Sequence, residues 1–130
     1  MIWLIRSAMC AFFPRAQGLP GVADVGIDAF LARFREETSR LMWVGLVLGA
    51  VVFAITPLFT IGVPLPSFLL PKRALDRHAN KIASHPVYVL RQAVFLVKMV
   101  GGLCWGSHPD VRRIMALPPY PPDPGTFRAQ

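Results

Sequence analysis

Apolar residues fill one long, uncharged stretch in the middle of the chain, from Leu41 to Leu70. This stretch contains no Asp, Glu, Lys, Arg or His. A helix needs about 20 mostly apolar residues to cross the hydrocarbon core of a bilayer, and residues 41–63 offer that length. We therefore predict a long apolar helix here, a candidate single span, which Pro57 ends or kinks at Thr56.

An amphipathic pattern precedes the apolar stretch and indicates that the same helix begins earlier. Asp28 is a suitable N-cap, and no helix breaker separates Arg40 from Leu41. The pattern predicts one continuous helix from Asp28, which leaves water near Trp43. Its apolar face at helical spacing consists of Ile27, Phe30, Leu31, Phe34 and Leu41.

Three further helices are predicted in the second half of the chain, the last a short one that follows Ser107-His108-Pro109-Asp110. Residues 71–83 have the pattern of a short surface helix. The triplet Ser84-His85-Pro86 combines a capping residue with a proline and starts a second long, amphipathic helix, from Val87 to about Trp105. This helix carries Lys98, whose insertion in the membrane would cost roughly 2.5–3.5 kcal/mol. We therefore expect one span, over residues 41–63, rather than two.

The two ends of the chain have a different character. Residues 1–27 combine apolar residues, two arginines and a Gly-Pro turn, so we expect a short interfacial helix followed by a linker. An arm that packs on a partner protein fits the same residues. Residues 118–130 are rich in proline and predict an extended tail. The prediction is thus an all-α, small membrane-associated protein, with residues 28–117 as its helical domain.

Several residues are candidates for contacts with lipid or protein. The pair Gly45 and Gly49 forms a GxxxG pattern that lets another helix approach closely. Prolines exclude a regular helix further on, so we interpret that apolar loop as a contact surface. The predicted contact residues are Gly45, Gly49, Ala50, Pro64, Pro66, Phe68 and Tyr120. The predicted membrane-interface residues are Trp3, Arg6, Trp43, Lys72, Arg73 and Arg77.

Composition agrees with a membrane-associated chain. The sequence is 54% hydrophobic and 16% charged, and its formal net charge is +7. Because Lys and Arg flank the apolar runs, we assign them to an anionic bilayer surface. No basic stripe with interleaved aromatic residues indicates nucleic-acid binding. We expect a membrane location, in the bacterial inner membrane, and lipid as one partner.

No motif for catalysis is present in the sequence. There is no phosphate-binding glycine loop, no HExxH and no nucleophile elbow. The triplets Ser84-His85-Pro86 and Ser107-His108-Pro109 suggest a paired site, but helix capping explains each of them. We therefore expect no catalytic, metal-binding or cofactor-binding residue in this chain.

A longer pattern, from about Phe30 to Leu117, resembles a known family. An amphipathic helix runs into an apolar one, a Leu-Pro-Lys-Arg-x-Leu-Asp-Arg segment follows (Leu70 to Arg77), and then come Pro-x-x-x-Leu-Arg (Pro86 to Arg91), Phe-Leu-Val-Lys-Met (95–99) and Asp-Val-Arg (110–112). This is similar to the small helical subunit that accompanies membrane-linked GMC-type (glucose-methanol-choline) flavin oxidoreductases, as in gluconate 2-dehydrogenase subunit 3.

The resemblance implies a function without chemistry in this chain. It implies a non-catalytic accessory subunit that anchors or covers a larger, FAD-bearing partner that oxidises alcohols. The long apolar segment and its GxxxG leave an alternative open. In that alternative the chain is a small structural subunit of another membrane complex, respiratory or photosynthetic.

Overall fold

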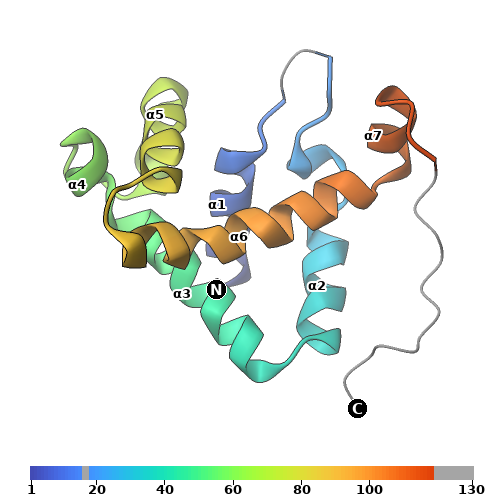
Figure 1. The fold of residues 1–130 in the computed structure, drawn as a ribbon, viewed down its shortest axis with the longest axis horizontal. Helices are drawn as coiled ribbons and strands as arrows, with labels where there is room; N and C mark the ends of the chain where they lie inside the picture. Colours follow the sequence, from blue (N-terminus) through green and yellow to red (C-terminus); the bar gives the residue numbers. More distant parts are fainter. Residues whose placement is uncertain (16–17, 119–130) are drawn as a thin grey trace.

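The computed structural model describes residues 1–15 and 18–118, and all regular elements in this part of the chain are helices (Figure 1). The all-α fold class predicted from the sequence is therefore confirmed. The helices are α1 (Ile2–Phe12), η1 (Val22–Asp24), α2 (Ile27–Glu37), α3 (Arg40–Ile55), α4 (Pro57–Ile61), η2 (Ser67–Leu69), α5 (Lys72–Ala83), α6 (Tyr88–Ser107) and α7 (Pro109–Ile114).

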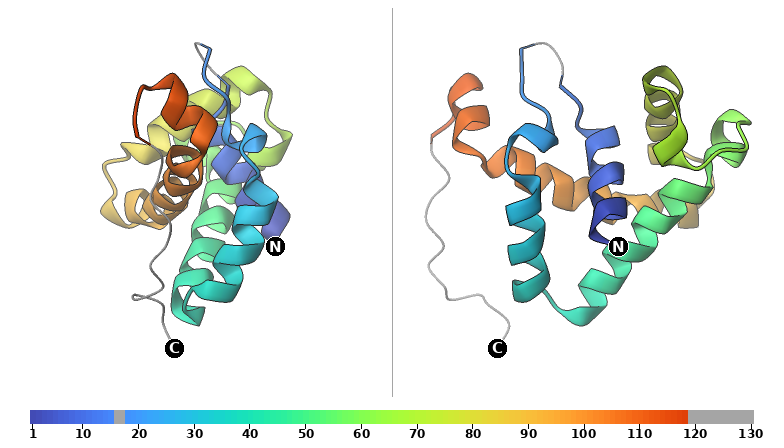
Figure 2. Two further views of the ribbon diagram at one scale, coloured as in Figure 1. Left: turned by 90° about the vertical axis from the view of Figure 1, so that its right-hand side faces the viewer. Right: turned by 180° about the vertical axis from the view of Figure 1, so that it is seen from behind.

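The N-terminal helix α1 is a central element of the hydrophobic core. Its buried side chains follow a helical period and are Leu4, Ile5, Ala8, Met9 and Ala11. The helix packs against α3, α5 and α6, and in Figure 2 it lies between α2 and α3 with α6 behind it. Residues 1–27 therefore do not form a separate interfacial arm, because α1 shares one core with the helices of residues 28–117.

The predicted continuous helix from Asp28 into the apolar stretch is wrong. The N-cap of α2 is Gly26, in the left-handed region with φ of +72°, so Asp28 lies in the first turn. After α2 ends at Glu37, the Oγ of Ser39 accepts a hydrogen bond from the backbone N–H of Met42 (3.2 Å) and caps α3. A serine that caps a new helix competes with continuation of the old one.

The apolar stretch is interrupted at Thr56 by Pro57, as predicted, which leaves its main helix shorter than a span. Helix α3 ends before Pro57, which lacks an N–H, and α4 starts with that proline in its first turn. The 16 residues of α3 extend about 24 Å at the usual helical rise, short of a hydrocarbon core of about 30 Å. In the described part of the chain, α6 is the helix long and apolar enough to cross a membrane. The long apolar helix is therefore Tyr88–Ser107 and not residues 41–63.

The helices of the second half agree with the sequence pattern, but their caps differ. The predicted surface helix is α5, and the second long helix is α6. Serine supplies the cap in neither Ser-His-Pro triplet: the N-cap of α6 is Val87, without a side-chain cap hydrogen bond, and the N-cap of α7 is His108. The Nδ1 of His85 accepts the N–H of Val87 (3.1 Å), and the Nδ1 of His108 accepts the N–H of Asp110 (3.2 Å).

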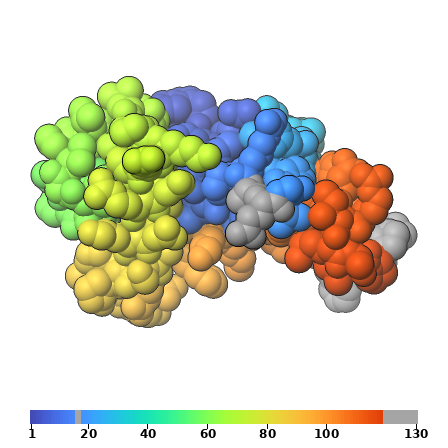
Figure 3. All heavy atoms as spheres, turned by 90° about the horizontal axis from the view of Figure 1, so that it is seen from above, coloured from blue at the N-terminus to red at the C-terminus, as the bar shows by residue number. Residues whose placement is uncertain are grey.

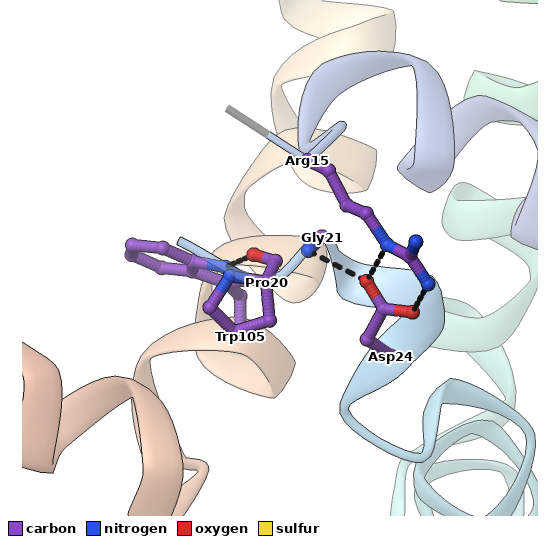
Figure 4. A network of polar contacts seen from close by, with 5 residues as sticks. All are labelled: Arg15, Pro20, Gly21, Asp24 and Trp105. Atoms are coloured by element: carbon purple, nitrogen blue, oxygen red, sulfur yellow. Dashed lines mark hydrogen bonds and ion pairs between the residues drawn. The ribbon is translucent and has the colours of Figure 1, made fainter. Parts of the chain in front are cut away.

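The segment that follows α1 is hydrogen-bonded to η1 and to α6 (Figure 4). Arg15 forms a bidentate ion pair with Asp24, whose carboxylate also accepts the N–H of Gly21 (3.0 Å). The indole N–H of Trp105 on α6 donates to the carbonyl of Pro20 (2.7 Å). This network holds α1, η1 and the C-terminal half of α6 in one unit.

Candidate membrane and partner interface

The closest helix contact is the crossing of α3 and α6, and the two glycines of the GxxxG pattern lie there. A Cβ added to Gly49 would lie 2.3 Å from the carbonyl oxygen of Ala93 on α6. A Cβ on Gly45 would lie 3.1 Å from a methyl group of Leu96, and Ala50 is fully buried. The helix that packs closely against these small residues is thus α6 of the same chain.

Beside this crossing, α3 exposes an apolar stripe. Its members lie three, four and seven residues apart and are Leu41, Val44, Leu48 and Ile55. Leu41 is 83% exposed and Ile55 is 64% exposed, so no described part of the chain covers the ends of the stripe. Helical spacing places all four on one face, which is the pattern of a helix that docks on another apolar surface.

Helix α6 exposes a second apolar stripe, which meets the first. Its exposed residues at helical spacing are Tyr88, Phe95, Met99 and Leu103, and Val89 lies beside them. An open groove of about 430 Å³ between the helices is lined by Leu48 from α3 and by Tyr88 and Val89 from α6. We call the two stripes and this groove the α3–α6 face.

The proline-rich loop reaches the surface next to the N-terminus. Phe68, on η2, packs edge-to-face against Trp3 of α1, with ring centroids 5.3 Å apart. Both rings remain largely exposed. Pro64 is exposed and Pro66 is half-buried as the N-cap of η2. The structure thus brings a predicted contact residue and a predicted membrane-interface residue into one patch.

The remaining predicted interface residues are spread over several helices. Arg6 forms an ion pair with Asp28 (3.1 Å), and Trp43 is half-buried beneath the guanidinium of Arg35. Three cations are exposed on α5, namely Lys72, Arg73 and Arg77. Tyr120 lies outside the described residues, as does the predicted tail apart from Pro118.

One residue of the basic run on α5 is not at the surface. His78 is fully buried, and both ring nitrogens are hydrogen-bonded, Nδ1 to the hydroxyl of Thr60 (2.6 Å) and Nε2 to the carbonyl of Phe53 (2.8 Å). Sequence reasoning grouped it with the neighbouring cations. The available signal was the helical period, since His78 lies with Ala74 and Ile82 on the buried face.

Metal-binding side chains do not gather in the part of the chain that the structure describes. No group of three His, Cys, Asp or Glu residues there could hold an ion. His85 and His108 lie at the starts of different helices, each hydrogen-bonded to its own backbone.

Comparisons with known proteins add no relative to this picture. The chain matches no family model, no curated protein and no solved structure.

Proposed function

We propose that this chain is a non-catalytic, membrane-associated accessory subunit that anchors or covers a larger enzyme. The observation that carries the proposal is the α3–α6 face, where two helices expose apolar stripes that meet at a groove. Contiguous apolar surface of this kind marks a site of contact with membrane or protein. The 20-residue α6, apolar enough to span, supports the membrane as one of these contacts.

Charge supports the same assignment. The chain carries 14 Lys and Arg against 7 Asp and Glu. Several acids are engaged by arginines, as in the pairs Arg6–Asp28, Arg15–Asp24 and Arg33–Glu37. The exposed cations of α5 are therefore free to contribute the attraction to anionic lipid, about 1 kcal/mol for each Lys or Arg near the surface.

For the partner, we propose a GMC-type flavin-dependent alcohol oxidoreductase. The family resemblance over residues 30–117 supports this choice, and the exposed patch of Trp3 and Phe68 offers a second docking surface. In this arrangement the partner holds the FAD and carries out the oxidation. The accessory chain contributes position at the membrane.

Co-purification from the native host tests the proposal. The tagged chain is extracted from membranes in mild detergent, and the eluate is examined for flavin absorbance and by mass spectrometry. We expect the chain in the membrane fraction together with a large flavoprotein. Recovery in the soluble fraction, without flavin and without a larger companion, would contradict the proposal.

A second candidate function has an observation of its own. The exposed apolar residues of α3 lie on one face, which suits a helix that packs against another helix of a larger membrane assembly. In this alternative the chain belongs to a respiratory or photosynthetic complex. Haem- or chlorophyll-bearing subunits in the same eluate, in place of a flavoprotein, would favour it.

A further inference from the structure

A hollow of about 590 Å³ lies beside α6 and combines cationic with apolar walls. It is bounded by α6, by the end of α5 and by the segment just after α1. Figure 3 views the molecule from above and shows orange atoms of α6 next to the blue N-terminal segment. The residues that define its chemistry are Phe13, Arg91, Phe95, Lys98, Met99 and Gly102.

The cationic wall consists of Arg91 and Lys98. Arg91 donates a hydrogen bond to the carbonyl of His85 (3.2 Å) and stacks on the ring of Tyr88 (5.5 Å), so its guanidinium is held in place. Lys98 forms no ion pair with any described residue. Seven residues along a helix correspond to about 10.5 Å, or about two turns. Arg91 and Lys98 therefore lie on the same side of α6 and line the same hollow.

Negative charge near these cations is sparse. The hollow itself is lined by no carboxylate among the described residues. A smaller neighbouring hollow of about 300 Å³ shares Lys98 and contains Asp76. Asp76 and Lys98 are not within ion-pair distance of each other. Two cations thus face a space that suits an anion.

The other wall is apolar and open along its length. Phe95 is 55% exposed and Met99 is 40% exposed on the stripe of α6. Beside them, Gly102 leaves space that a side chain would fill, because its added Cβ would already touch the ring of Phe13 at 3.5 Å. An extended hydrocarbon chain can lie in this open strip while its polar end remains near Arg91.

We propose that this hollow binds one anionic phospholipid, with its phosphate between Arg91 and Lys98 and an acyl chain along Phe95, Met99 and Gly102. Arginine binds phosphate through parallel N–H bonds, and lysine adds a point charge. The pairing also lowers the cost of a cation on a membrane-inserted helix. The inference rests on the proposed membrane association and adds a lipid class and a site to it.

Vesicle flotation and native mass spectrometry of the full chain test this site. The vesicles contain phosphatidylcholine alone or phosphatidylcholine with phosphatidylglycerol. We expect flotation with both, and one phosphatidylglycerol retained per chain in the mass spectrum. The double variant R91Q/K98Q is expected to lose about tenfold or more in phosphatidylglycerol affinity. The matched control is R33Q/R113Q, which removes the same charge from α2 and α7, away from the hollow and from α5.

Shape is tested separately from charge. Gly102→Leu blocks the strip beside Phe13, whereas Gly106→Leu, one turn further on, has no atom within 4 Å of its added Cβ. We expect the first variant to lose the retained lipid and the second to keep it. Inorganic phosphate at millimolar concentration distinguishes a free-anion site, because it should not displace a lipid that also binds through its chain.

The outcomes separate this inference from the proposed function. If the wild-type chain floats with neither vesicle, the membrane proposal fails. If it floats with both, but R91Q/K98Q and R33Q/R113Q lose affinity equally, membrane association stands and the specific site is overturned. Displacement by inorganic phosphate, with Gly102→Leu unaffected, would also overturn the lipid assignment.

Discussion

The imidazole of His78 on α5 donates its Nε2–H to the carbonyl oxygen of Phe53 on α3, 2.8 Å away. In a regular helix this carbonyl would accept the N–H of residue 57, but Pro57 has none. The histidine from α5 therefore satisfies a group that the proline leaves without a helical partner. Because Nε2 carries the proton, Nδ1 accepts from the hydroxyl of Thr60 on α4. One neutral ring thus connects three helices.

Removal of this ring should cost more stability than any exposed substitution. We expect His78→Ala to lower the free energy of unfolding by about 2–4 kcal/mol, because it leaves a buried carbonyl unpaired and opens a cavity. The measurement is urea unfolding followed by circular dichroism in mild detergent. His85→Ala serves as the control, since His85 is half-buried and its ring only accepts the backbone N–H of Val87 just before α6. Equal losses in the two variants would contradict the bridging role.

The same histidine predicts a dependence of stability on pH. Burial lowers the pKa of His78 below its ordinary value of 6.5, although the bond to Phe53 acts in the opposite direction. The unfolded chain therefore binds a proton more readily than the folded one. Stability should be complete above about pH 6.5 and should fall as the pH drops below that value. Unfolding midpoints measured across this range should decrease in the wild type and stay flatter in His78→Gln.

The crossing of α3 and α6 predicts opposite tolerances at two neighbouring glycines. Gly49→Ala forces a Cβ against a backbone carbonyl and should cost about 1–3 kcal/mol, as overpacking does. Gly45→Ala meets only the end of a flexible leucine, and alanine favours a helix over glycine by up to about 1 kcal/mol. We therefore expect Gly45→Ala to be neutral or stabilising in the same unfolding assay. A larger loss at Gly45 than at Gly49 would show that the helices cross elsewhere.

Much of the helical layout could be predicted from local pattern, and the errors have local causes. The period of α5 and the His-Pro start of α6 carry strong signals. The break before α3 was missed because Thr38-Ser39 looks like two polar positions within a helix. Only the structure shows that the Oγ of Ser39 caps α3. The predicted span over residues 41–63 failed because Pro57 ends α3 and does not merely kink it.

The site was harder to predict because it depends on pairings between distant segments. The sequence marked Gly45 and Gly49 as a docking surface, but only the fold shows that α6 occupies it. Likewise Pro57 predicts that the carbonyl of Phe53 lacks a helical partner, but the sequence does not show that His78, 25 residues further on, binds it. The central place of α1 had no local signal, because an apolar helix of 11 residues suits a membrane surface as well as a core.

The ion pair beside η1 predicts an acidic titration that NMR can detect. The guanidinium of Arg15 lowers the pKa of Asp24 from 3.8 to about 2. The stabilising contribution of this pair is therefore present above about pH 4 and is lost as the pH falls toward 2. Arg15→Gln should return the carboxyl pKa toward its ordinary value. Carbon-detected titration of the aspartates measures this, and an unchanged Asp24 in the variant would contradict the pairing.

The α3–α6 face makes a prediction about membrane association that leaves the fold intact. Leu48 is exposed and lines the groove between the two helices, so Leu48→Glu should change the free energy of unfolding by less than about 0.5 kcal/mol. A carboxylate at this point must nevertheless be removed from water when the face enters lipid, which costs several kcal/mol. We therefore expect the variant to leave the vesicle fraction in flotation. Ala32→Glu introduces the same charge on the exposed side of α2 and should float like the wild type. Equal flotation of all three proteins would mean that this face does not contact the membrane and would direct attention to a protein partner.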